Sequence, residues 1–279
     1  MTAAFLLALA SSLAYGGADF LGGVAARGAH VLRVIVVAAP ASLAVEVVLW
    51  PALGAQFPLG AVTWGAASGL ASAVSFGLLY RTLALGPMSV LSPMTALVSA
   101  ALPVAVGLAE GERLGGLAVL GMVLALVAIV MVSAGSDARG ARPSRAALIM
   151  AFGAGAAIAL QLVCLHQSPS DSGVAPLLIG RAVSSGVVLS AALSLRSRLG
   201  QARPSLPKSA AAGALDSLAN VAFLLSVRDG DLAVVAVITA LYPAGTVLLA
   251  RALLDERIGR VQLAGLGVAA LAVSLLALG

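Results

Sequence analysis

Polar side chains stand in the middle of long apolar stretches at several places in this sequence, among them Arg181, Asp216 and Asn220. Burying a charge in an apolar medium is costly, so such residues usually face a partner or a cavity. Asp216 and Asn220 are four residues apart and share one face of a helix. At about 1.5 Å per residue, Arg181 and Asp216 both fall near the middle of adjacent stretches. The spacing therefore predicts a buried ion pair between them.

This predicted polar cluster has two interpretations. In the first, it lines a substrate cavity, where Arg181 would meet a carboxylate and Asp216 an ammonium group. In the second, it only holds two helices together. The residue types favour neither interpretation. Under the first, five more side chains are candidates for the cavity lining: Tyr15, Asp19, Ser72, Gln161 and Tyr242.

Two further acidic residues have more than one interpretation. Asp19 has glycine pairs on both sides, at 16–17 and 22–23, which would let the helix unwind around an ion or a substrate. The alternative is a helix end that reaches water near Arg27. Glu46 lies close to the end of its apolar stretch, so we expect it in contact with water.

The sequence shows no set of residues for enzymatic or metal chemistry. The acids are scattered, and both His30 and His166 lie near the ends of apolar stretches. The single cysteine, Cys164, excludes an internal disulfide and a cysteine-based metal cluster. Lys208 is the only lysine and there is no Walker A motif, which excludes ATP-driven work by this chain alone. We expect no catalytic residue, metal or cofactor; an intramembrane enzyme or a solute channel stays the alternative to a transporter.

The composition indicates that these residues lie in a membrane. Apolar residues make up 61% of the 279, charged residues 10%, and the mean hydropathy is +1.10. Soluble domains carry roughly 25% charged residues, so this chain could not cover a soluble surface. The net charge of +5 does not indicate nucleic acid, because the basic residues lie in short gaps between apolar runs.

Ten stretches are long and apolar enough to cross the hydrocarbon core. The sequence thus predicts an all-α integral membrane protein with ten transmembrane helices. The predicted spans are 3–24, 31–50, 59–83, 87–108, 114–134, 146–166, 174–195, 209–228, 231–253 and 259–278.

The two halves of the chain resemble each other at an offset of 144 residues. ERLG at 112–115 recurs as ERIG at 256–259, TAL at 95–97 recurs at 239–241, and Gly121 pairs with Gly265. Five spans per half is an odd number, so the second copy enters the membrane inverted, as in many secondary transporters. We predict a first repeat at 1–135, a linker at 136–145 and a second repeat at 146–279. Three prolines in corresponding bent helices are candidate gates or hinges: Pro93, Pro103 and Pro243.

The repeated segments resemble a known family. Residues 240–258, ALYPAGTVLLARALLDERI, and residues 85–114 resemble the recurring segment of EamA-like members of the drug/metabolite transporter superfamily. YGGADF at 15–20 stands where that family usually has its first helix. The resemblance implies alternating-access transport of amino acids or related metabolites, often export, and is compatible with YddG-type amino-acid exporters. Expected partners are a small-molecule substrate and the lipid bilayer, with no nucleic acid and no ATPase subunit; a monomer fits this expectation.

Orientation follows from the placement of the basic residues. Connections after odd-numbered spans hold thirteen of them, and connections after even-numbered spans hold only Arg113 and Arg228. Because basic connections stay in the cytoplasm, we predict a multi-pass protein of the cell (inner) membrane with both termini outside. Members of the resembled family commonly have cytoplasmic termini, which conflicts with this count.

Overall fold

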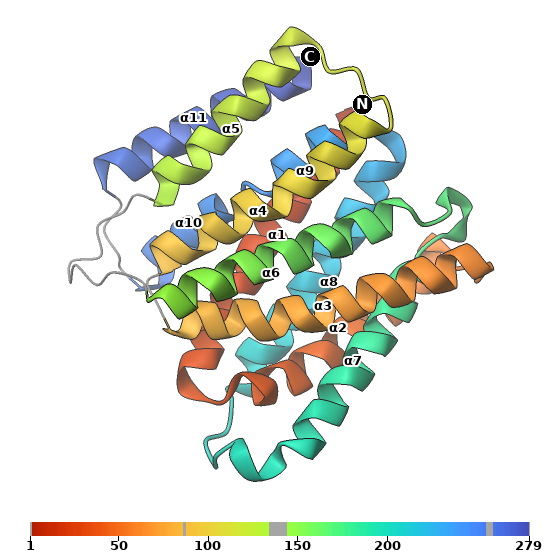
Figure 1. Ribbon diagram of the computed structural model, residues 1–279, viewed down its shortest axis with the longest axis vertical. Helices are drawn as coiled ribbons and strands as arrows, with labels where there is room; N and C mark the ends of the chain where they lie inside the picture. The colour runs from red at the N-terminus through yellow and green to blue at the C-terminus, as the bar shows by residue number, and fades with distance from the viewer. Residues whose placement is uncertain (1, 86–87, 134–143, 255–258, 279) are drawn as a thin grey trace.

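The computed structural model describes residues 2–85, 88–133, 144–254 and 259–278 (Figure 1). Within these residues the fold is all-helical, as predicted. The α-helices are α1 (Thr2–Gly28), α2 (Val31–Leu53), α3 (Leu59–Leu85), α4 (Met88–Ala109), α5 (Gly116–Ser133), α6 (Arg145–His166), α7 (Ala175–Ser194), α8 (Leu206–Asp229), α9 (Leu232–Thr239), α10 (Tyr242–Leu254) and α11 (Arg260–Leu278). Two 3-10 helices, η1 (Ser170–Ser172) and η2 (Arg196–Arg198), lie in connections.

Each predicted span contains a helix within the described residues, because lipid offers no partner for an unpaired backbone amide or carbonyl. Seven helices of the described residues are long and apolar enough to cross a membrane: α1, α2, α3, α6, α7, α8 and α11. Three shorter apolar helices, Met94–Ala109, Gly116–Val132 and Leu232–Thr246, fall in the other three predicted spans. The predicted linker lies outside the described residues except for its last two positions, so the division into two repeats stays a prediction.

The ninth predicted span is broken into α9 and α10. Ala240 and Leu241 form a tight turn, and the Leu241 amide donates to the Ile238 carbonyl at 3.1 Å. Pro243 has no amide hydrogen, so the Thr239 carbonyl lacks its usual helical donor. The predicted loosening at Pro243 is therefore present.

Two other predicted irregularities are absent. α4 continues as a helix through Pro93 and Pro103, although the side chain of Pro93 lies outside the described residues. α1 continues through its four glycines, so the predicted unwinding around Asp19 is wrong. These glycines serve close packing instead: a Cβ at Gly16 would lie 2.6 Å from the Tyr242 carbonyl oxygen.

Helices from the two halves alternate in the bundle. α1 packs against α8 and α10, α2 against α8, α3 against α6 and α7, and α4 against α6. α5 and α11 lie side by side at one edge (Figure 1). Glycine allows the closest approach: Gly69 of α3 lies against the Gly180 backbone of α7 with no room for a Cβ. On the same helix, a Cβ at Gly65 would lie 2.7 Å from the Pro176 carbonyl oxygen, whereas a Cβ at Gly77 would face open space.

Both chain ends and the α4–α5 connection lie on one face of the bundle, here named the terminus face (Figure 1). Ala4 and Leu276 line one cavity there together with Arg113. Glu110 of the α4–α5 connection contacts His166 at the end of α6. The connections that follow even-numbered predicted spans therefore share this face.

Candidate functional site

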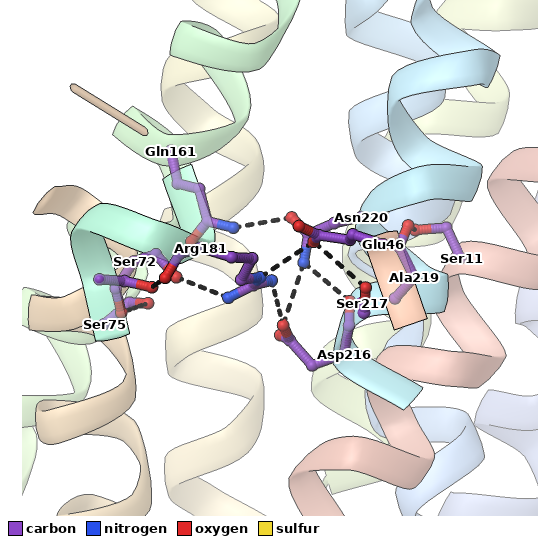
Figure 2. Close-up of polar contacts among 11 residues, drawn as sticks. Ser11, Glu46, Ser72, Ser75, Gln161, Arg181, Asp216, Ser217, Ala219 and Asn220 are labelled. Carbon is purple, nitrogen blue, oxygen red and sulfur yellow. Dashed lines mark hydrogen bonds and ion pairs between the residues drawn. The ribbon is translucent and has the colours of Figure 1, made fainter. Parts of the chain in front are cut away.

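Arg181 of α7 is the centre of a buried polar network (Figure 2). Its side chain is 3% exposed, and it donates through Nε to Glu46 Oε1 at 3.2 Å and through Nη1 to Ser72 Oγ at 3.0 Å. Nη2 donates to the Asp216 carboxylate, so the predicted ion pair is present. The guanidinium carbon also lies 5.4 Å from the centre of the Phe76 ring, a cation–π contact.

Asn220 and Gln161 extend this network toward α6. The Asn220 amide donates to the Asp216 carboxylate at 3.2 Å and to the Asp216 backbone carbonyl at 2.8 Å. Asn220 Oδ1 accepts from Gln161 Nε2 at 2.7 Å (Figure 2). Asp216 and Asn220 share one face of α8, as predicted from their spacing. Five helices, α2, α3, α6, α7 and α8, thus contribute one polar group or more.

Glu46 belongs to the same network, and the expectation that it contacts water is wrong. Its side chain is 0% exposed, because α2 continues to Leu53 and places Glu46 about 10 Å inside the helix end. Glu46 Oε1 also accepts from Ser217 Oγ at 3.1 Å, a residue that sequence reasoning did not single out. Glu46 Oε2 has no hydrogen-bond partner within the described part of the chain.

The network is electrostatically unbalanced. Among the buried polar residues of the described chain, Arg181 is the only basic one, and two carboxylates contact it directly. If Glu46 and Asp216 are both ionised, the network carries one net negative charge. An uncompensated charge in such an environment costs several kcal/mol. In that ionisation state, the network favours the approach of a positive charge.

Tyr15, Asp19 and Tyr242 meet at a second place in the interior. They line a void of about 20 Å³ together with Ser99, Ile158, Leu162, Ala236, Thr239 and Ala240. Asp19 is 6% exposed, so the alternative of a helix end in water is also wrong. The Tyr15 and Tyr242 rings lie 6.5 Å apart, and Tyr242 Oη donates to the Ser92 carbonyl at 3.4 Å.

A smaller void of about 10 Å³ lies beside Arg181 itself, between Ser72, Gln161 and Asn220. Since a water molecule needs roughly 10–15 Å³ of such volume, each of these two voids takes about one water-sized body. Neither holds a metabolite as it stands. The predicted cavity residues thus fall into two neighbouring polar groups, one around Arg181 and one around Asp19. The predicted hinge residue Pro103 lines neither void.

Glu112 has a structural task that sequence reasoning missed. It lies in the α4–α5 connection, and its carboxylate accepts from the Leu232 amide at 2.6 Å and the Ala233 amide at 3.0 Å. These are the first two amides of α9, which have no partner inside the helix. The only sequence signal for this role was the recurrence of Glu-Arg in both halves. That recurrence does not by itself reveal which groups the glutamate contacts.

A larger cavity of about 170 Å³ opens at the terminus face. Its lining is mostly apolar, with Arg113 of the α4–α5 connection and Asp231 at the start of α9 as its charged residues. None of the predicted site residues lines it. It is therefore separate from the network of Arg181.

Comparisons with known proteins agree with the resemblance seen in the sequence. Residues 145–278 match the EamA-like transporter family. Among 28 similar chains of solved structures, one crystal structure superposes with a TM-score of 0.76 over 100% of this chain and 97% of its own, at 16% identity. At that identity the likeness shows the fold alone. No curated protein matches the sequence.

Proposed function

We propose that the whole chain is a secondary transporter of small organic solutes, because residues 145–278 match the EamA-like transporter family. The family is one of transporters and not of enzymes, which sets aside the enzyme alternative. Amino acids and related metabolites are the proposed substrates and export the proposed direction. Both rest on the family resemblance.

Alternating access around a site between two inverted repeats is the proposed mechanism. The packing of Gly121 and Gly265, which are 144 positions apart, supports such repeats. A Cβ at Gly121 of α5 would lie 3.1 Å from the Leu276 amide of α11, and a Cβ at Gly265 of α11 would lie 2.6 Å from the Val132 amide of α5. Leu276 and Val132 are themselves 144 positions apart, so the two contacts are related by a two-fold exchange of the halves.

The observation that carries the proposed site is the network around Arg181. It joins α2 and α3 of the first half to α6, α7 and α8 of the second. Ionisable groups inside membrane-spanning segments are rare and usually have a function. An amino-acid zwitterion offers a carboxylate to Arg181 and an ammonium group to the surplus carboxylates. The halves would part and close around it.

Uptake of a panel of labelled amino acids into liposomes that contain the purified protein tests this proposal. We expect saturable uptake that is lost in Arg181→Gln and Asp216→Asn and kept in Ser274→Ala. Ser274 is a matched control because its hydroxyl is exposed and donates only to the Ala270 carbonyl of its own helix. No uptake by folded protein would overturn the amino-acid assignment, and flux that does not saturate would indicate a channel instead.

A further inference from the structure

Asp19 is a buried carboxylate without a partner. It is 6% exposed near the middle of α1 and makes no hydrogen bond or ion pair among the described residues. Arg181, the only buried basic side chain described, is already held by Glu46 and Asp216. An ionised carboxylate in this position needs a positive charge that these residues do not supply.

Several residues with hydroxyl groups line the void beside Asp19. Tyr15 Oη and Thr239 Oγ1 are buried without hydrogen-bond partners, and both residues line the same void of about 20 Å³. Ser99 and Tyr242 also line the void, and their hydroxyl groups donate to the Ala96 and Ser92 carbonyls. A void of this size takes one water-sized body, which fits a single ion and excludes a metabolite. Oxygen ligands of this kind suit hard cations.

The helix break adds to this preference. α9 ends at Thr239, and the last carbonyls of a helix carry partial negative charge. Ala236, Thr239 and Ala240 bring that end of α9 to the void. The start of α10 brings partial positive charge to the same break. The full negative charge of an ionised Asp19 outweighs it, so the void attracts a cation. Half-helix ends at mid-membrane are where transporters bind coupling cations.

We propose that Asp19, Thr239 and the end of α9 form a site for one small monovalent cation, a sodium ion or a proton, that drives transport. The site joins α1 of the first half to the α9–α10 break of the second. Thr246 Oγ1 of α10 donates to the Gly16 carbonyl of α1 at 3.2 Å, so α1 and α10 are in direct contact beside the void. A cation bound there neutralises Asp19 and holds the two halves together. Its coupling role rests on the proposed transport function; its existence as a site does not.

The other titratable groups around Asp19 are known from the packing. They are Tyr15 on α1 itself, Tyr80 on α3, Asp216 on α8 and Tyr242 on α10. Asp216 is the carboxylate among these four described groups, and it is engaged by Arg181. Asp19 is therefore the group that a bound cation would serve.

Thermal unfolding of the purified protein tests the site without any substrate. A ligand that binds only the folded state raises the unfolding temperature with its concentration. The unfolding temperature is measured in sodium chloride and in choline chloride of equal ionic strength, each at several pH values. We expect a saturable rise of several degrees with sodium or with falling pH, abolished in Asp19→Asn and kept in Asp229→Asn, which changes an exposed carboxylate at the end of α8. An unchanged response in Asp19→Asn, or a wild type that responds to neither cation, would overturn the proposal.

Thr239→Val separates the two cations and serves if Asp19→Asn does not fold. It keeps the side-chain shape and removes one oxygen ligand, so a sodium response should weaken at least tenfold in apparent Kd while a proton response stays. In liposomes, Thr239→Val should retain solute exchange and weaken accumulation driven by a sodium gradient. If exchange is absent from the wild type while the unfolding response is present, the proposed function fails and the cation site stands.

Discussion

Ser72 Oγ and the Asp216 carboxylate accept hydrogen bonds from the same guanidinium, that of Arg181. The two residues lie 144 positions apart, which is the offset of the predicted repeat. If α3 and α8 are equivalent helices of inverted repeats, their equivalent positions flank Arg181 from the two halves. At these two positions one half would supply a neutral acceptor and the other a charged one, while Glu46 of the first half adds a second carboxylate. This pair of positions would be symmetric in place and asymmetric in charge.

This asymmetry predicts unequal effects of two substitutions. Asp216 forms an ion pair with Arg181, whereas the Ser72 hydroxyl only accepts a hydrogen bond from it, and removing one partner of a buried ion pair leaves an uncompensated charge. Asp216→Asn should therefore slow initial transport in liposomes about tenfold or more, and Ser72→Ala less than that. Size-exclusion chromatography of each variant checks that the protein is folded. Equal losses in both variants would mean that Asp216 acts only as a hydrogen-bond acceptor.

The contact of Glu112 with α9 predicts a stability effect. Glu112→Ala leaves two amides without an acceptor, and loss of a helix cap costs about 1 kcal/mol. Asp231→Ala is the matched control, because Asp231 occupies the N-cap position of α9 and its side chain makes no capping hydrogen bond. Thermal unfolding should thus show a larger loss in Glu112→Ala. The reverse order would assign the cap to Asp231.

The helix positions and the Arg181–Asp216 pair could be predicted because the place of a residue within an apolar stretch gives its depth in the membrane. A stretch of about 20 apolar residues has one way to cross lipid, so residues in the middle of two adjacent stretches meet at similar depth. Glu46 was misplaced because the end of α2 was predicted at residue 50, three residues before Leu53. The glycines of α1 were misinterpreted because sequence does not distinguish a glycine that frees the backbone from one that admits a neighbouring helix. The break at Thr239 depends on Pro243, yet α4 carries two prolines without a break.

Close packing of α3 on α7 predicts that two glycines of one helix differ sharply. A Cβ at Gly69 would overlap the Gly180 backbone, which cannot move without shifting α7. Gly69→Ala should therefore lower the unfolding temperature and the yield of folded protein. Gly77→Ala meets nothing within 4 Å and should stabilise by about 0.5–1 kcal/mol through helix propensity. Equal tolerance of both changes would contradict the close contact of these helices.

At the terminus face, Glu110 predicts a pH dependence. The hydrogen bond from His166, 2.9 Å long, lowers the pKa of the Glu110 carboxyl below its usual value, and Gln167 adds to this. The stabilisation is thus present above the usual pKa of a glutamate and is lost as the pH falls through the lowered value. The unfolding temperatures of the wild type and Glu110→Gln should differ at neutral pH and converge in acid. A difference that does not change with pH would rule out the contact as its source.

Orientation in the membrane is decided by labelling two positions on opposite faces. Gly116 begins α5 at the terminus face, and Gln201 lies beside Gly200, which accepts a hydrogen bond from Arg33 of the α1–α2 end at 2.5 Å. Both are exposed and uncharged, so Gly116→Cys and Gln201→Cys leave the charge distribution intact. In a Cys164→Ser background, a membrane-impermeant maleimide should label Gly116→Cys on intact cells and Gln201→Cys only after permeabilisation. Because thirteen basic residues lie in the odd-numbered connections, the opposite labelling would mean that they do not set the orientation of this chain.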